Sequence, residues 1–259
     1  MFEAFFLEDT VSTMKIIILA AGKGERLMPL TRNTPKSLLD MGNGRTLLEE
    51  QIEQMRESGV IDEVVLVIGY LGGQIEAKIK TLVESIKVRT IFNPFYDMSN
   101  NLVTLWLVRH EMSEDFLVIN GDNLIAADVF KGLVNGTSNG IFLSVSRKDQ
   151  YDDDDMKVVL KDNMVISVSK LITNERGDAE SPGLALIRGA RARGVFRDHL
   201  EMLVRDREYL NKFWLEVFNS VYAHGGIVCP WEFDGNTKWQ EVDFHIDLDR
   251  AKELLHVFL

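Results

Sequence analysis

The 259-residue chain contains a single cysteine, Cys229, so no disulfide can form within it. It has no apolar run near the ~20 residues that a membrane-spanning helix needs. Basic residues are also scarce relative to acidic ones: 29 Lys and Arg stand against 40 Asp and Glu, for a net charge of −11. Such an excess of negative charge opposes non-specific binding to nucleic acid or to an anionic membrane. We therefore expect neither partner, and we expect a cytoplasmic location.

Marks of several other protein classes are missing too. The five histidines show no metal-ligand spacing, and there is no internal repeat or low-complexity tract. Residues 1–13 lack the basic start and the long apolar segment of a signal peptide. Two interpretations stay open for them: an N-terminal arm whose phenylalanines pack elsewhere, including across a contact in a homo-oligomer, or sequence upstream of a natural start at Met14.

Strand and helix patterns alternate over the first half of the chain. β-branched apolar runs predict buried strands at residues 16–19, 63–68, 88–92 and 116–119. Apolar periodicity predicts intervening helices, one from Leu47 that is closed by Gly59 and others at 75–86 and 101–112. Alternation of this kind favours an α/β fold with a mostly parallel sheet and helices on both faces. In such folds, ligands bind at the carboxyl ends of the strands.

The pattern changes after residue 141. It predicts strands without intervening helices, at residues 142–146, 157–161, 164–170 and 184–188. It then predicts two helices, at 190–204 and 207–222, followed by strands near Ile227 and Gln240 and a last helix from Leu248. At 46% hydrophobic residues the chain can bury a full core, so we expect one domain over 14–259 with a small C-terminal lobe.

The first predicted strand opens into a loop with two glycines and several charges. Gly22 and Gly24 would let a polyphosphate approach the backbone closely enough to accept several N–H bonds. Lys23, Arg26 and, further on, Lys36 could neutralise its charge. Neither the Walker pattern nor the dinucleotide fingerprint is met, because no Gly-Lys-Ser/Thr opens a helix and no third glycine follows. The loop therefore predicts a phosphate site of another kind.

Three segments carry a family resemblance: L-A-A-G-K-G-E-R-L at 19–27 with P-K-S-L at 35–38, V-I-N-G-D-N at 118–123, and W-Q-E-V-D at 239–243. Together they resemble the nucleotidyltransferases that make nucleoside diphosphate sugars and alcohols. The resemblance covers residues 14 to 257 and implies a Rossmann-like (GT-A-like) fold with a small C-terminal acceptor-binding lobe. It also implies that Arg26 and Lys36 are catalytic. The residues that it implies for nucleotide binding are Leu19, Ala20, Ala21, Gly22, Lys23, Gly24, Gly69, Tyr70, Asn120 and Gly121.

A magnesium site is expected from the same segments. Nucleotidyl transfer brings an anionic acceptor against an anionic α-phosphate, and a divalent cation relieves that repulsion. Asp122 follows a predicted strand, while Glu241 and Asp243 are two apart, so an extended backbone would point both to one face. Carboxylate oxygens are the ligands that Mg²⁺ prefers. The alternative makes Asp122 a turn residue and Asp243 the N-cap of the last helix.

The acceptor side is similar to the small cytidylyltransferases, which use CTP to activate phosphocholine, glycerol phosphate or 2-aminoethylphosphonate. The acceptor-binding residues that this similarity implies are Asn101, Lys157, Lys170 and Glu180. We therefore expect CTP and a small anionic phosphate or phosphonate as partners. Two alternatives stay open: a sugar-1-phosphate uridylyl- or thymidylyltransferase, and a non-catalytic nucleotide-sensing subunit.

The acidic run at residues 152–155 has two interpretations. A solvated loop is the commonest fate of such a run. Alternatively, one of its carboxylates acts together with an aromatic ring, Tyr151 or Trp214, to face a cationic head group. In that case Lys157 would meet the phosphate or phosphonate of the same acceptor.

Overall fold

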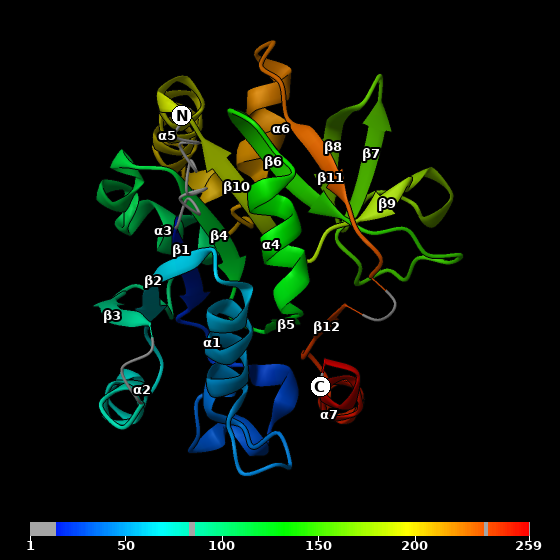
Figure 1. The fold of residues 1–259 in the computed structure, drawn as a ribbon. Coiled ribbons are helices and arrows are strands. Elements are labelled where there is room, and N and C mark those ends of the chain that lie inside the picture. Colours follow the sequence, from blue (N-terminus) through cyan, green and yellow to red (C-terminus); the bar gives the residue numbers. More distant parts are fainter. Residues whose placement is uncertain (1–13, 83–85, 236–237, 259) are drawn as a thin grey trace, which may run out of the picture.

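The computed structural model describes residues 14–82, 86–235 and 238–258. The predicted arm at residues 1–13 lies outside the described residues. In the described chain, a seven-stranded sheet is flanked by helices on both faces (Figure 1). The strand order is β11 (Cys229–Glu232), β6 (Gly140–Val145), β10 (Leu184–Arg188), β4 (Phe116–Asn120), β1 (Met14–Ala20), β2 (Ile61–Ile68) and β3 (Lys87–Phe92). No helix in the described residues is long and apolar enough to cross a membrane.

The sheet is mostly parallel around its central strand, β1. This strand pairs in parallel with β2 and β4, and β2 pairs in parallel with β3, whereas β10 runs antiparallel to both of its neighbours. Ile16, Ile17 and Ile18 are completely buried. A strand covered on both faces needs a continuous apolar run rather than an alternating one, and that is what its sequence provides. The predicted fold class is confirmed.

Six helices divide between the two faces of the sheet, as the alternating side chains of β1 show. Ile16 and Ile18 share a core cluster with helix residues such as Leu48 and Phe130. Ile17 shares another with Leu105, among others. The first face carries α1 (Leu47–Ser58), α2 (Gly72–Ile79) and α4 (Ala127–Asn135). The opposite face carries α3 (Asn101–Leu107), α5 (Ala190–Val204) and α6 (Glu216–Ala223).

Helix α1 ends at Gly59 as its sequence predicts, and the structure adds a capping box at its start. The Thr46 side chain accepts a hydrogen bond from the N–H of Glu49, and the Glu49 carboxylate accepts one from the N–H of Thr46. This reciprocal capping box satisfies two otherwise unpaired donors of the first turn. Gly59 closes the helix at φ 68°, a left-handed conformation that glycine adopts without a Cβ penalty.

Two small sheets and a last helix complete the molecule. β7 (Lys157–Lys161), β8 (Met164–Ser169) and β9 (Ala179–Glu180) form an antiparallel sheet in the order β8-β7-β9. β5 (Asn123–Ile125) pairs antiparallel with β12 (Trp239–Glu241). The last helix, α7 (His245–Phe258), begins earlier than predicted and packs its Leu248 and Leu255 in one cluster with Leu27 and Leu124. The C-terminal segment thus lies against the loop that follows β1.

The predicted helix at 207–222 is wrong. The structure has a short 3-10 turn at Arg207–Tyr209 and then α6, because the chain between them turns inward to bury Trp214. Helix α4 was not predicted. The helix predicted at 75–86 begins earlier, at Gly72, and its helical span ends at Ile79. The one predicted at 101–112 is α3 followed by a 3-10 turn at Arg109–Ser113.

Candidate active site

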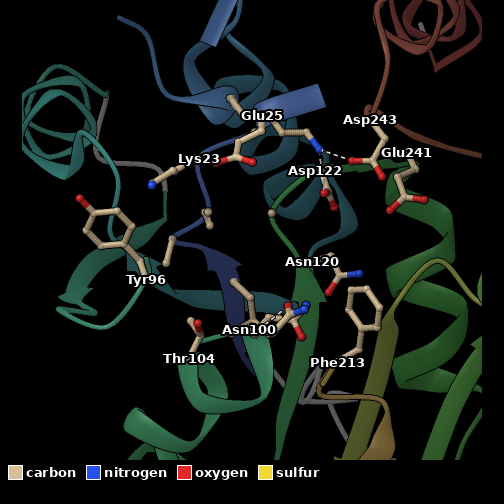
Figure 2. Close-up of a pocket in the computed structure, with 18 of the residues that line it drawn as sticks. Lys23, Glu25, Tyr96, Asn100, Thr104, Asn120, Asp122, Phe213, Glu241 and Asp243 are labelled. Atoms are coloured by element: carbon tan, nitrogen blue, oxygen red, sulfur yellow. Dashed lines mark hydrogen bonds and ion pairs between the residues drawn. The ribbon is translucent and has the colours of Figure 1, made fainter. Parts of the chain in front are cut away.

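A cavity of about 560 Å³ opens at the carboxyl ends of β1 and β4. Its lining combines segments that lie far apart in the sequence (Figure 2). They include the loop after β1, the segment before and at the start of α3, the end of β4, the loop before α6 and the end of β12, and also Lys36, Met156, Lys170 and Ser181. The cavity therefore lies where ligands are expected in an α/β sheet.

The loop after β1 is packed tightly except at one glycine. Gly24 has φ +63°, and a Cβ there would lie 3.1 Å from Cβ of Lys36. A Cβ on Gly121, at the end of β4, would lie 2.7 Å from Cβ of Ala20. At Gly22, by contrast, no atom lies within 4 Å of the position that a Cβ would take. The backbone of Gly22 therefore faces open space, which leaves room for a ligand to approach its N–H.

Lys36 lines the cavity and lies between two carboxylates. Its Nζ is 2.8 Å from Oδ2 of Asp122 and 2.6 Å from Oδ1 of Asp243. Burial by itself would lower the pKa of this ammonium, but the charges and hydrogen bonds of the two carboxylates raise the pKa above its usual value. Lys36 is therefore a fixed positive charge throughout the physiological pH range.

The other loop cations also have acidic partners. Nη1 of Arg26 lies 2.8 Å from Oδ2 of Asp154 and 2.9 Å from Oδ2 of Asp243. Lys23 forms an ion pair with Asp97 across the cavity. Each cation predicted to handle phosphate is thus neutralised by a carboxylate of the same chain. Both Arg26 and Asp154 remain roughly half exposed.

Asp122, Glu241 and Asp243 form a cluster in which one oxygen from each lies within 4.8 Å of the others. Figure 2 shows the three side chains turned toward one another. Burial and the charges of Asp122 and Asp243 raise the pKa of Glu241 to about 8. At Asp243, burial has the same upward effect, but Lys36 and Arg26 outweigh it and lower the pKa. Three close carboxylates that repel one another, all with oxygen donors, form a donor set suited to a hard divalent cation.

Strand pairing explains why the three carboxylates meet. β12 pairs with β5, the strand directly after Asp122, so that Glu241 lies opposite Asn123. The N–H of Val242 then donates to the carbonyl oxygen of Asp122 at 3.0 Å. The N–H of Asp243 and the N–H of Phe244 both donate to the carboxylate of Asp247, which fixes the turn into α7. The carboxylate of Asp243 itself is paired with Lys36 and Arg26.

Comparison with known proteins agrees with this geometry. A family model described as nucleotidyl transferase matches residues 15–140. The choline-phosphate cytidylyltransferase of Streptococcus pneumoniae is 40% identical over 136 residues, which cover 52% of this chain and 55% of the relative. A solved structure of a CTP:phosphocholine cytidylyltransferase from the same species superposes with a TM-score of 0.75 and 26% identity over 94% of this chain and 99% of that one. Residues 15–140 therefore match the nucleotidyl transferase family, and the fold as a whole matches that of a solved cytidylyltransferase.

Other matches differ in coverage. The CTP:phosphoglutamine cytidylyltransferase of Campylobacter jejuni is 26% identical over 272 residues, 91% of this chain and 98% of the relative. The match to the choline-phosphate enzyme, by contrast, spans only about half of that relative's length. The family model ends at residue 140, so it includes the loop, Lys36 and Asp122 but neither Glu241 nor Asp243. The family resemblance predicted from the sequence is confirmed.

Most residues predicted for the site do line the cavity. They are Leu19, Ala20, Ala21, Gly22, Lys23, Gly24, Arg26, Lys36, Asn101, Asn120, Gly121, Asp122, Lys170, Glu241 and Asp243. Their predicted contacts with ligands stay predictions. The structure brings them together from both halves of the chain.

Four predicted residues do not line the cavity. A Cβ on Gly69 would lie 2.6 Å from the carbonyl oxygen of Ala21, so Gly69 packs directly against the backbone at the start of the loop after β1. Tyr70 donates its hydroxyl to the carbonyl oxygen of Arg32 at 2.6 Å. Lys157 is fully buried, and its ammonium donates to the carbonyl oxygen of Asp152 at 2.7 Å. Glu180 is buried and lies 2.8 Å from Lys148.

The acidic run divides between two environments. Asp154 accepts hydrogen bonds from Arg26 at 2.8 Å and from Lys170 at 3.0 Å, so it lies at the cavity rim. Asp155 instead pairs with Lys148. Trp214 is fully buried, so the prediction that its ring could face a cationic head group is wrong.

Several lining residues were not predicted from the sequence. They include Tyr96, Ser99, Thr104, Ser181 and Phe213. Only Phe213 carried a detectable signal: an aromatic side chain directly before a tryptophan in a polar segment. Its ring lies 5.6 Å from the ammonium of Lys170.

Proposed function

We propose that this protein is a Mg²⁺-dependent cytidylyltransferase that transfers the cytidylyl group of CTP to a phosphoalcohol or phosphonate and releases pyrophosphate. The cluster of Asp122, Glu241 and Asp243 beside Lys36 is the observation that carries the proposal. Relatives that match over most of both chains support the choice of CTP, since their names specify it. The relatives' acceptors differ, so a choice among acceptors rests on experiment.

In this reaction an oxygen of the acceptor attacks the α-phosphorus of CTP, a new P–O bond forms, and the bond to the β-phosphate oxygen breaks. No covalent intermediate with the protein is required, so its task is positioning and charge stabilisation. Mg²⁺, held by the three carboxylates, would supply positive charge to the reacting phosphates. Arg26 and Lys36 would exchange their carboxylate partners for phosphate oxygens. The open backbone at Gly22 would receive the triphosphate.

Lys170 is the best-placed group for the acceptor. Its ammonium lies at the cavity rim between Asp154 and the ring of Phe213. It can meet a phosphate or phosphonate oxygen once Asp154 turns away. Asp154 and Phe213 would then be available to an ammonium group on the same acceptor, by charge and by the ring face.

The test is a matrix of substrates with pyrophosphate release as the readout. CTP, UTP, dTTP and GTP are each combined with phosphocholine, 2-aminoethylphosphonate, glycerol phosphate, inositol phosphate and glucose 1-phosphate, with and without Mg²⁺. We expect turnover with CTP and at least one phosphoalcohol or phosphonate, and none after chelation of the metal. Turnover only with UTP or dTTP and a hexose 1-phosphate would assign the protein to the sugar-nucleotide enzymes. Nucleotide binding without turnover in any combination would indicate a sensing subunit.

A further inference from the structure

Trp214 connects two asparagines that line the cavity, although its own side chain is fully buried. Its indole Nε1–H donates to Oδ1 of Asn120 at 2.8 Å. Its backbone N–H donates to Oδ1 of Asn101, also at 2.8 Å. The two asparagines come from different elements: Asn120 ends β4, and Asn101 begins α3.

The contact with Trp214 fixes which way each amide points. An indole N–H and a backbone N–H can only donate, so the amide atom that faces each of them must be the carbonyl oxygen. Each Nδ2 then lies on the other side of its amide. Neither Nδ2 donates a hydrogen bond to any residue in the parts of the chain that the structure describes. Both amide nitrogens therefore lack an acceptor in the described chain, and both residues line the cavity.

The chain also makes room for the amide of Asn120. Gly183 has φ +69°, and a Cβ there would clash with Nδ2 of Asn120. The backbone N–H of Asn120 donates to the carbonyl oxygen of Gly183 at 3.3 Å. The residue after Asn120, Gly121, donates its N–H to the carbonyl oxygen of Leu19 at 2.9 Å, next to the loop after β1. Asn120 thus lies next to the loop after β1, where the triphosphate is proposed to bind.

We propose that Trp214 is a positioning residue for nucleotide binding, which acts by holding the Asn120 amide with its nitrogen available to an oxygen acceptor of bound CTP. This inference rests on the proposed function. Without the indole N–H, the Asn120 amide can rotate and present its oxygen, which would repel an acceptor group of the ligand. Trp214 itself makes no contact with CTP.

Trp214→Phe isolates this role, because phenylalanine keeps the backbone N–H to Asn101 and most of the buried volume but removes the indole N–H. Loss of one positioned hydrogen bond should raise KM for CTP about 3- to 10-fold. We expect kcat and KM for the acceptor to change less than about twofold, a limit below the effect of one lost hydrogen bond. Trp106→Phe is the matched control, since its indole N–H donates instead to Glu201, which does not line the cavity.

A double-mutant cycle separates positioning from a general loss of core packing. Asn120→Ala should itself raise KM for CTP about 3- to 10-fold, the range for one lost hydrogen bond. In the Asn120→Ala background, Trp214→Phe should then add little to KM for CTP, since its effect passes through the missing amide. Additive effects, or equal changes of KM for CTP and for the acceptor, would overturn the proposal. If Trp214→Phe does not fold, an unchanged KM for CTP in Asn120→Ala overturns it independently.

Calorimetric titration of Mg²⁺–CTP without acceptor distinguishes failure of the proposed function from failure of this inference alone. A wild type that binds no CTP contradicts the proposed function and this inference together. A wild type that binds and turns over CTP, beside a Trp214→Phe variant with unchanged affinity, contradicts the inference alone.

Discussion

The ammonium of Lys36 lies 2.6 Å from Oδ1 of Asp243. From the sequence, Lys36 was expected to face phosphate oxygens. In the structure it neutralises two of the three clustered carboxylates instead. The Lys36 ammonium thus pairs with carboxylates that are proposed to bind Mg²⁺. The same carboxylates pair with an ammonium that is proposed to bind phosphate. Binding of Mg²⁺ and CTP would replace both.

Lys36→Met removes this charge and keeps the bulk of the side chain. Breaking a buried ion pair leaves an uncompensated charge, and for these partly buried carboxylates we expect a loss of about 1–3 kcal/mol in the free energy of unfolding. Thermal unfolding in EDTA should show a Tm a few degrees lower. Mg²⁺ should raise the Tm of the variant more than that of wild type, because no ammonium competes for the carboxylates. Unchanged Tm in EDTA would contradict this assignment.

Asp122→Asn and Asp243→Asn each remove one carboxylate from the cluster. We expect each to lower kcat on the order of 10²-fold or more, because an amide oxygen holds a hard cation more weakly. Asp128→Asn is the control: Asp128 is exposed and pairs with Lys238, and it does not line the cavity. Near-normal turnover at limiting Mg²⁺ in either cluster variant would show that the carboxylate is not a metal ligand.

The sequence predicts the central sheet well because burial on both faces requires the continuous β-branched runs seen at 16–18. It predicts which carboxylates could meet but not why they do. Their meeting depends on the pairing of β12 with β5, which joins segments more than a hundred residues apart. Such pairing leaves no local pattern in either segment.

At Lys157 and Trp214 the structure differs from what the local sequence pattern predicts. A lysine in a strand is expected to reach solvent or an anion, yet the loop that contains Asp152 covers Lys157 and accepts its hydrogen bond. Trp214 lies where helical periodicity predicted a continuous helix. Its backbone N–H is held instead by the side chain of Asn101, a contact across 113 residues.

Gln51 binds the backbone on both sides of Asp122. Its Nε2 donates to the carbonyl oxygens of Gly121 and Asn123, at 3.2 and 2.9 Å, so it fixes the backbone on both sides of Asp122. Gln51→Leu keeps the size but leaves these carbonyls without this donor, at a cost of about 1–3 kcal/mol for a buried group. We expect weaker stabilisation by Mg²⁺ in thermal shift assays.

The exposed Gln74 provides the control for that measurement, since it donates to the carbonyl oxygen of Asn33, away from the cluster. Gln74→Leu should respond to Mg²⁺ as wild type does. If Gln51→Leu lowers Tm but keeps the full response to Mg²⁺, Gln51 stabilises the fold without positioning Asp122.

Glu180 should make stability depend on pH. Burial, opposed in part by Lys148, raises the pKa of Glu180 to about 7. An acid whose pKa is raised on folding contributes stability that is fully present below its unfolded pKa of about 4.5 and is lost as pH rises through 7. Tm measured from pH 4.5 to 8 should therefore include a downward contribution that Glu180→Gln removes.

Glu111 is the matched control for pH. A hydrogen bond from Arg89 lowers its pKa to about 2, so it stays ionised over the whole window. Above about pH 5.5, where Glu111 is ionised in the unfolded state as well, the Tm difference between wild type and Glu111→Gln should therefore be constant, whereas that for Glu180→Gln should still change. Parallel curves for both variants would contradict the raised pKa of Glu180.

The choice of base provides the last prediction. Cytosine and uracil differ at the Watson–Crick edge, where a donor replaces an acceptor, and a buried mismatched polar group costs about 1–3 kcal/mol. We expect CTP to be preferred over UTP by at least about tenfold in kcat/KM, which corresponds to roughly 1.4 kcal/mol. The measurement is competition between the two triphosphates with one acceptor, followed by separation of the products. Equal use of UTP would contradict the cytidylyltransferase assignment while leaving nucleotidyl transfer intact, because Lys36, Arg26 and the carboxylate cluster act on phosphates and not on the base.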